Sequence, residues 1–95
     1  MSTIKKIAVK MDLNDNIAVV MQDVKKDDEV YIDNLKIISK QSIDRGHKIA
    51  TTSIANNEYI IKYGVPIGKA KKDILIGQHV HEHNVADITN EINAK

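Results

Sequence analysis

An all-β fold is predicted for this 95-residue chain by the kind of apolar residue it contains and by how those residues are grouped. Sixteen Ile and eight Val stand against three Leu, with no Phe or Trp, and β-branched side chains favour strands over helices. They occur in short runs separated by Asp, Asn and Gly, which is typical of strands and turns. The length allows one domain, expected over residues 1–95 with its core at about 4–85.

The apolar runs give the expected elements in chain order. Strands are expected at residues 4–11, 17–21, 31–32, 35–38 and 49–50. Turns are expected at residues 12–16, 24–30, 33–34 and 62–68. The run 17–21 suits a strand buried on both faces, and 62–68 holds the only proline and two of four glycines, which predicts a sharp reversal. Residues 86–94 are compatible with a short C-terminal helical turn.

A weak internal repeat is visible in the spacing of β-branched residues. Pairs six positions apart enclose a polar or Gly-containing turn at three places: Val24 to Val30, Ile54 to Ile60 and Ile74 to Val80. Residues 16–18 and 48–50 also correspond, at a spacing of 32 residues. The pattern predicts two similar β-halves rather than a solenoid.

Charge and composition exclude several classes of function. A net charge of +1 with a single Arg leaves no basic stripe, so nucleic acid is not an expected partner. Cysteine is absent, which excludes disulfides, zinc ribbons and thiol chemistry. Charged residues between positions 5 and 15 break up the apolar residues near the N-terminus, so we expect no export signal, no membrane segment and a cytoplasmic location.

The stretch 77–84 carries three of the four histidines, His79, His81 and His83, at alternate positions. On an extended strand, alternate side chains share a face and two neighbouring imidazoles can bind one transition-metal ion. All three would span about 13 Å on a straight strand, too far for one ion unless the chain bends. The remaining histidine, Asn84 or Glu82 would then lie beside the ligand pair. The alternative to a metal site is an exposed strand face whose imidazoles are solvated.

His47 stands alone, between Gly46 and the strand at 49–50. Its ordinary pKa near neutrality suits a general base or a substrate ligand, and a turn cap is the structural alternative.

Four ordered motifs together resemble one family: residues 15–18, 45–50, 61–70 and 77–84. They are similar to the N-terminal SAF-type domain, or separate small subunit, of altronate dehydratases, with galactarate dehydratase and sulfolactate sulfo-lyase as relatives. The resemblance covers residues 4–85. It implies a β-clip, a small and strongly bent all-β domain with long hairpins that is also seen in antifreeze-like domains.

The resemblance also implies a chemistry and a set of site residues. The activity would be that of a hydro-lyase converting altronate to 2-dehydro-3-deoxygluconate, linked with Fe²⁺ or Mn²⁺. The implied metal ligands are His81 and His83, with His79 as a third candidate; His47 is the candidate catalytic imidazole, and Asn84, Lys48 and Lys62 are the candidate substrate groups.

A partner is expected because fused family members continue into a much larger second part where this chain ends, at Lys95. The resemblance therefore implies a large catalytic subunit and no activity of the chain alone, and a homo-oligomer stays open. Two alternatives remain: the small subunit of a sulfolactate sulfo-lyase, and a stand-alone, non-catalytic β-clip module that binds carbohydrate. An antifreeze-like face would need many small and Thr residues, and only Thr51 and Thr52 stand together.

Overall fold

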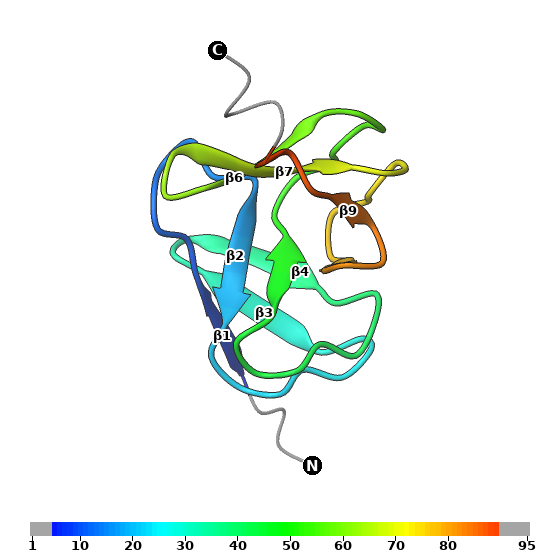
Figure 1. The fold of residues 1–95 in the computed structure, drawn as a ribbon. Helices are drawn as coiled ribbons and strands as arrows, with labels where there is room; N and C mark the ends of the chain where they lie inside the picture. Colours follow the sequence, from blue (N-terminus) through cyan, green and yellow to red (C-terminus); the bar gives the residue numbers. More distant parts are fainter. Residues whose placement is uncertain (1–4, 90–95) are drawn as a thin grey trace.

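The computed structural model describes residues 5–89, and within this range the chain forms nine short strands in two sheets (Figure 1). The strands are β1 (Lys6–Val9), β2 (Ile17–Val20), β3 (Glu29–Ile32), β4 (Leu35–Ile38), β5 (Lys48–Ala50), β6 (Tyr59–Lys62), β7 (Val65–Ala70), β8 (His79–Val80) and β9 (Val85–Ala86). A six-stranded sheet has the order β4-β3-β1-β2-β5-β8, and a three-stranded sheet has the order β6-β7-β9. The predicted all-β fold is confirmed. No helix among the described residues is long and apolar enough to cross a membrane.

Two apolar cores hold the sheets together, and β2 and β5 contribute to both. The first core consists of Ala8, Ala18, Val20, Val24, Val30, Ile32, Ile37, Ile43 and Ile49. The second consists of Ile17, Ala50, Ile54, Ile60, Ala70, Ile74 and Val80. Successive strand residues point to opposite faces, so Ile17 and Ala18 enter different cores. The prediction that this strand is buried on both faces is confirmed.

The internal repeat comprises four copies of one tight turn. The turns span residues 25–28, 44–47, 55–58 and 75–78, and in each the N–H of the fourth residue donates to the carbonyl of the first, over 2.9–3.0 Å. The third residue has a positive φ in every copy: Asp27, Gly46, Asn57 and Gly77. A positive φ at this position is the mark of a type II turn. The sequence predicted three copies and missed the one between Ile43 and Ile49, which the structure adds.

The four turns are joined in pairs, so the chain consists of two similar halves as predicted. Val24 pairs with Ile43 in the first half, and Ile54 pairs with Ile74 in the second. The corresponding positions are 30 residues apart at the start of the repeat and 31 apart at its end, not 32. One extra residue in the second half accounts for the difference, because a bulge in the β6–β7 hairpin leaves Ile67 without a partner across the ladder.

Side chains lock three of the four turns. The fourth residue of the turn accepts a hydrogen bond from the backbone N–H of the first residue at Asp28, Glu58 and Gln78, over 2.6–2.8 Å. In the remaining copy this position is His47, whose ring packs against other histidines. The position of His47 is therefore one that the fold normally uses for stability.

The loop between β1 and β2 clamps the tip of the β6–β7 hairpin (Figure 1). The buried carboxylate of Asp15 accepts backbone hydrogen bonds from Gly64 (2.8 Å), Tyr63 (3.1 Å) and Asp12 (3.1 Å). Asn16 adds two more, accepting from the N–H of Ile61 and donating to a carbonyl of β6. This clamp holds Tyr63 at a φ of 57°, in the left-handed region that residues other than glycine seldom adopt.

Three local predictions need correction. The reversal expected over 62–68 is confined to Tyr63 and Gly64, while Pro66 and Gly68 lie within β7. The histidine strand expected over 77–84 ends at Val80, because the chain turns at 81–84. The helical turn expected over 86–94 lies mostly outside the described residues, and Ala86 belongs to β9.

Replacing the Asp15 carboxylate should destabilise the protein. In Asp15→Asn one acceptor becomes an NH₂ group facing backbone N–H donors, and we expect the free energy of unfolding to fall by about 2–3 kcal/mol. Asp33→Asn is the matched control, because Asp33 occupies the turn of the β3–β4 hairpin and is exposed; it should change stability by less than about 0.5 kcal/mol. Urea unfolding measures both, and equal effects of the two variants would contradict the clamp.

Candidate functional site

The pairing of β5 with β8 brings the solitary His47 to the histidine run. Lys48 lies opposite Val80 and Ile49 opposite His79, so the same register places His47 opposite His81. The His47 and His81 rings stack with their centroids 4.2 Å apart, and His47 Nδ1 lies 2.9 Å from His79 Nε2. One ring nitrogen of each of these three residues lies within 4.8 Å of the others. We refer to His47, His79 and His81 as the imidazole triad.

A turn anchored by Asn84 positions the second and third members of the triad. The Asn84 amide accepts from the His81 N–H (2.9 Å) and donates to the His79 carbonyl (2.8 Å), and its backbone N–H donates to the His81 carbonyl (3.0 Å). Gln41 accepts from the His79 N–H (2.8 Å) on the other side. The buried Asn84 thus bends the chain after β8 and holds the imidazoles.

The ring of His79 is held in the neutral form. Burial and, in decreasing order, the neighbouring charges of His83, His47 and His81 together lower the pKa of His79 to about 4. Its short contact with His47 requires one ring to donate and the other to accept, which two imidazolium rings cannot do. Neutral imidazoles are the form that binds metal ions.

The donor set fits a transition-metal ion. Two nitrogens that each lie about 2.1 Å from one ion, at an angle near 90–110°, are about 3.0–3.4 Å apart. The 2.9 Å between His47 Nδ1 and His79 Nε2 is close to that range, and His81 offers a third nitrogen. Imidazole ligands suit Fe²⁺, Mn²⁺ or Zn²⁺ better than Ca²⁺.

His83 stands beside the triad rather than in it. Its ring is tilted by 38° to that of His79, at a centroid distance of 5.2 Å. Burial lowers its pKa, and the charge of Lys72 adds to this effect. The structure therefore groups His47 with His79 and His81, where the sequence suggested His81 and His83 as the ligand pair.

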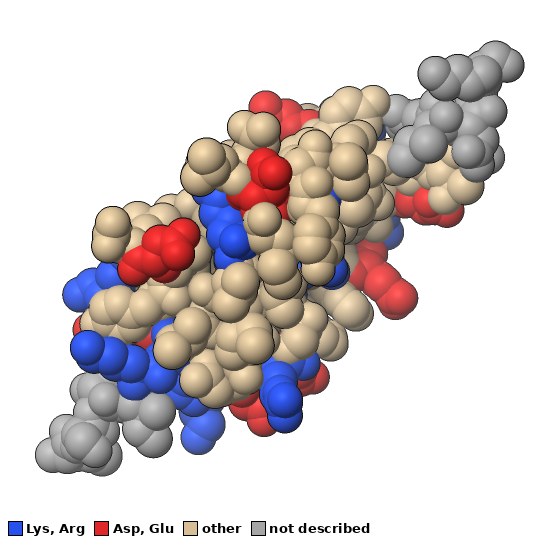
Figure 2. Space-filling view, turned by 90° about the vertical axis from the view of Figure 1, so that its left-hand side faces the viewer, with Lys and Arg blue, Asp and Glu red and all other residues tan. Residues whose placement is uncertain are grey.

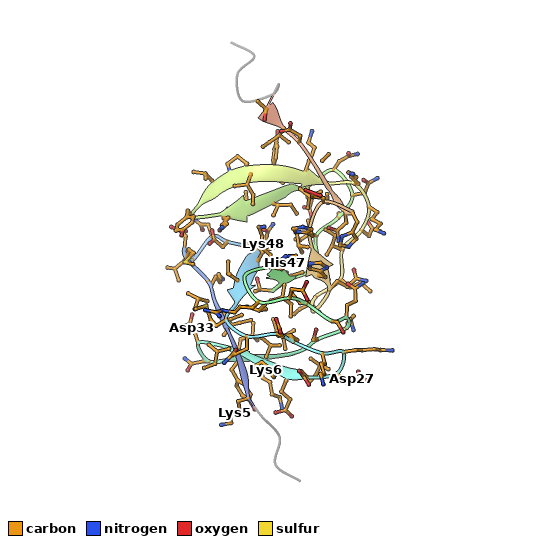
Figure 3. The ribbon with its side chains drawn as sticks, turned by 60° about the horizontal axis from the view of Figure 1, so that its bottom comes forward. Lys5, Lys6, Asp27, Asp33, His47 and Lys48 are labelled. Carbon is orange, nitrogen blue, oxygen red and sulfur yellow. The ribbon has the colours of Figure 1, made fainter. Side chains whose placement is uncertain are left out.

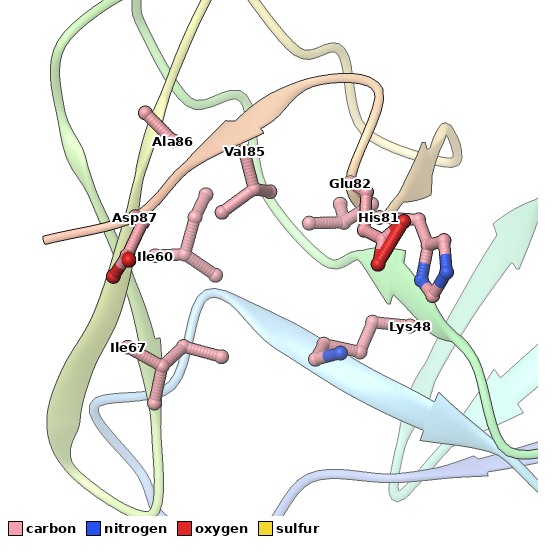
Figure 4. A pocket seen from close by; sticks show the side chains of 9 residues that line it. Lys48, Ile60, Ile67, His81, Glu82, Val85, Ala86 and Asp87 are labelled. Carbon is pink, nitrogen blue, oxygen red and sulfur yellow. The ribbon is translucent and has the colours of Figure 1, made fainter. Parts of the chain in front are cut away.

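A groove of about 320 Å³ lies next to the triad and shares His81 with it (Figure 4). Its lining residues are Lys48, Ile60, Ile67, Val80, His81, Glu82, Val85, Ala86 and Asp87. Figure 4 shows the Lys48 side chain among the lining residues of the groove, and Figure 3 shows Lys48 next to His47. The groove thus joins an apolar wall to one cationic group and one imidazole.

Lys48 is the cation of the groove. Burial lowers its pKa, and the positive charge of Lys62 lowers it further. No ion pair to Lys48 is formed within residues 5–89. An anionic ligand would stabilise the charged form of this half-buried ammonium, and a carboxylate is a common partner for such a group.

The structure separates the predicted site residues by what each of them contacts. His47, His79 and His81 meet in the triad; His83 adjoins it; Lys48 lines the groove; and Lys62 acts on Lys48 through its charge. The side-chain amide of Asn84, expected to contact substrate, is used at both ends by the backbone. Sequence reasoning missed Gln41 and Asp87, because neither belongs to a motif and both meet the site through long-range contacts.

Comparison with known proteins shows the family of this all-β domain. The family model of the altronate/galactarate dehydratase SAF domain matches residues 6–88, and the chain belongs to this family. It is 43% identical to altronate dehydratase of Bacillus subtilis and 46% identical to that of Escherichia coli, over 76 residues in each case. These matches cover 80% of this chain but only 15% of either relative. It is also 48% identical to (2R)-sulfolactate sulfo-lyase subunit alpha of Chromohalobacter salexigens over 46 residues, 48% of this chain and 49% of that subunit.

The pKa of His79 predicts how stability depends on pH in the metal-free chain. The folded pKa is about 4 and the ordinary value is 6.5, so between these values the unfolded chain binds a proton that the folded chain does not. The free energy of unfolding should therefore fall as the pH is lowered from about 6.5 to about 4 and be unaffected by His79 above that window. Urea unfolding with a chelator should show this slope, reduced in His79→Asn. An NMR titration of the His79 ring with a midpoint near 6.5 would contradict it.

Proposed function

We propose that this chain is the SAF component of a hydro-lyase of the altronate dehydratase class, which eliminates water from a sugar acid at a site completed by a larger catalytic component. The observation that carries the proposal is the imidazole triad bordering a groove that contains Lys48, which forms no ion pair among the described residues. A cation-binding group and a carboxylate-binding group lie side by side, which is what elimination next to a carboxylate needs. The family and its relatives support the same reaction class.

The reaction would begin with the carboxylate of the sugar acid paired to Lys48. Loss of the proton from C2, next to the carboxylate, moves negative charge toward the carboxylate oxygens, where the ammonium stabilises it. The hydroxyl on C3 leaves with its bonding electrons and takes up a proton, which forms water. The resulting enol becomes the 2-keto-3-deoxy acid. Lys62 would raise the positive potential near Lys48.

The proposed metal ligands are His47, His79 and His81. An Fe²⁺ or Mn²⁺ ion held there would act as a Lewis acid toward the substrate oxygens. Three protein ligands leave coordination positions open, as in catalytic rather than structural sites. Asn84 and Gln41 would serve the ion by fixing the backbone of His79 and His81.

The larger component would supply what the chain lacks. The groove is open, and with His47 assigned to the metal we assign the base that removes the C2 proton to the larger component. Since the chain corresponds to 15% of the altronate dehydratases it matches, most of their polypeptide has no counterpart here. The chain alone should therefore bind metal but not turn over substrate.

Sulfolactate is the second candidate substrate, favoured by the match to a sulfo-lyase subunit alpha. It also carries a carboxylate, so Lys48 would not distinguish the two acids. A non-catalytic carbohydrate module is the third reading; it would bind sugar acids without any need for the triad.

Activity can be tested in a fused enzyme made from the altronate dehydratase of Bacillus subtilis. The SAF segment of that protein is replaced by residues 6–88 of this chain. His81→Ala should lower altronate dehydration by about 100-fold or more, while the matched control His83→Ala stays within about threefold. Lys48→Met should raise KM at least tenfold, with partial rescue in Lys48→Arg, because a carboxylate contact is lost. Parallel assays with sulfolactate identify the substrate. Full activity of the fused enzyme after His47→Ala plus His81→Ala would overturn the proposal.

Metal binding can be measured separately, on the chain alone. Titration calorimetry with Mn²⁺ should give one site per chain, weakened at least tenfold in His81→Ala and little changed in His83→Ala. Binding should also weaken at acidic pH, because protons compete with the metal ion for the imidazole nitrogens. Equal loss of affinity in the two variants would contradict the triad as the ligand set.

A further inference from the structure

An apolar patch covers the tip of the β6–β7 hairpin and the loop beside it. Its members are Leu13, Tyr63, Val65 and Ile67, which are 93%, 61%, 53% and 40% exposed. The loop and the tip are adjacent because the Asp15 carboxylate bonds the backbone of Tyr63 and Gly64 (Figure 1). Figure 2 views this side of the molecule and shows uncharged side chains over much of the middle of the face. We call these four residues the hairpin patch.

The two halves of the chain show that the fold does not require this patch. The corresponding hairpin, β3–β4, turns through Asp33 and Asn34, polar residues that suit a tight turn. The β6–β7 hairpin has Tyr63 at the position of Asp33 and carries Ile67 as an additional residue. An exposed aromatic side chain held in a left-handed conformation by a buried carboxylate contributes little to the core, which supports a role in contact with a partner.

The patch is continuous with the candidate site. Ile67 belongs both to the patch and to the wall of the groove that contains Lys48 and His81. A partner seated on Tyr63 and Val65 would therefore reach the open side of the groove. Closing an active site excludes water and strengthens the charge interactions within it.

We infer that the hairpin patch is the surface on which the larger catalytic component of the lyase docks. This inference rests on the proposed function. The altronate dehydratases that the chain matches contain more than five times the matched length, so a partner of sufficient size is present in the fused proteins. The occupant would present an apolar surface to Tyr63 and Val65, since exposed aromatic residues are enriched at such contacts.

Side-chain footprinting by hydroxyl radicals tests the inference without relying on activity. The fused enzyme described above is compared with the chain alone. Oxidation of Tyr63 and Leu13 should be slowed about fivefold or more in the fused enzyme. Tyr31 and Leu35 on the β3–β4 hairpin are the controls and should differ by less than about twofold.

Variants give a second measurement in the same enzyme. Tyr63→Ser plus Val65→Ser should restore oxidation of Leu13 to the rate in the isolated chain. The control Leu35→Ser plus Ile38→Ser, which replaces two exposed apolar residues outside the patch, should not. The inference would be overturned if Tyr63 were oxidised as fast in the fused enzyme as in the chain alone. So would a dimer of the isolated chain in which Tyr63 is already protected. Protection of Tyr63 in an enzyme that does not dehydrate altronate would leave the docking surface standing and refute only the proposed function.

Discussion

Strands β5 and β8 meet with Lys48 opposite Val80 and Ile49 opposite His79, and the arrangement of the site follows from this register. A shift of one residue would reverse the faces of the whole strand. Ile49 would leave the first core and Val80 the second, so burial on both sides fixes the pairing firmly. The same pairing sets His47 against His81 and directs Lys48 toward the groove. The apolar packing of the two cores thus determines where the chemically useful side chains lie.

The site keeps uncompensated groups of two kinds next to each other. Three imidazole rings, among them the neutral ring of His79, lie close together on one side, and a half-buried ammonium without an ion-pair partner in the described residues lies on the other. Neither arrangement favours folding, because burial disfavours the charged forms of both His79 and Lys48. A bound cation at the triad and an anion at Lys48 would each relieve part of that strain, and ligands that bind only the folded chain would stabilise it.

Local chemistry made much of the fold predictable. β-branched composition indicated strands, and the bend at Asp33 and Asn34 lies where turn residues placed it. The strand predicted over the histidine run was too long. Alternate histidines suit a strand, but the Asn84 side chain accepts a hydrogen bond from the His81 N–H and forms a turn there. That hydrogen bond is local, so a turn at Asn84 could have been considered from the sequence.

Other features depended on contacts between distant segments. His47 and His79, whose rings are in contact, are 32 residues apart in the sequence. Asp15 and Gly64, which are joined by a hydrogen bond, are 49 residues apart. No periodicity in the sequence encodes such pairings. The overlooked turn at 44–47 was the only hint of the His47 pairing that we find in the sequence. It aligns Gly46 and His47 with Gly77 and Gln78 at the repeat spacing. It shows that His47 precedes β5 in the same way that Gln78 precedes β8.

His47 occupies a position where three sister turns carry a side chain that secures the turn. An acid or an amide there would strengthen the domain, and an imidazole turned toward its neighbours forgoes that bond. Under the proposed function, stability and activity therefore make opposite demands on this one residue. A selection for heat resistance alone would tend to replace His47 first and leave a sturdier domain with an incomplete site.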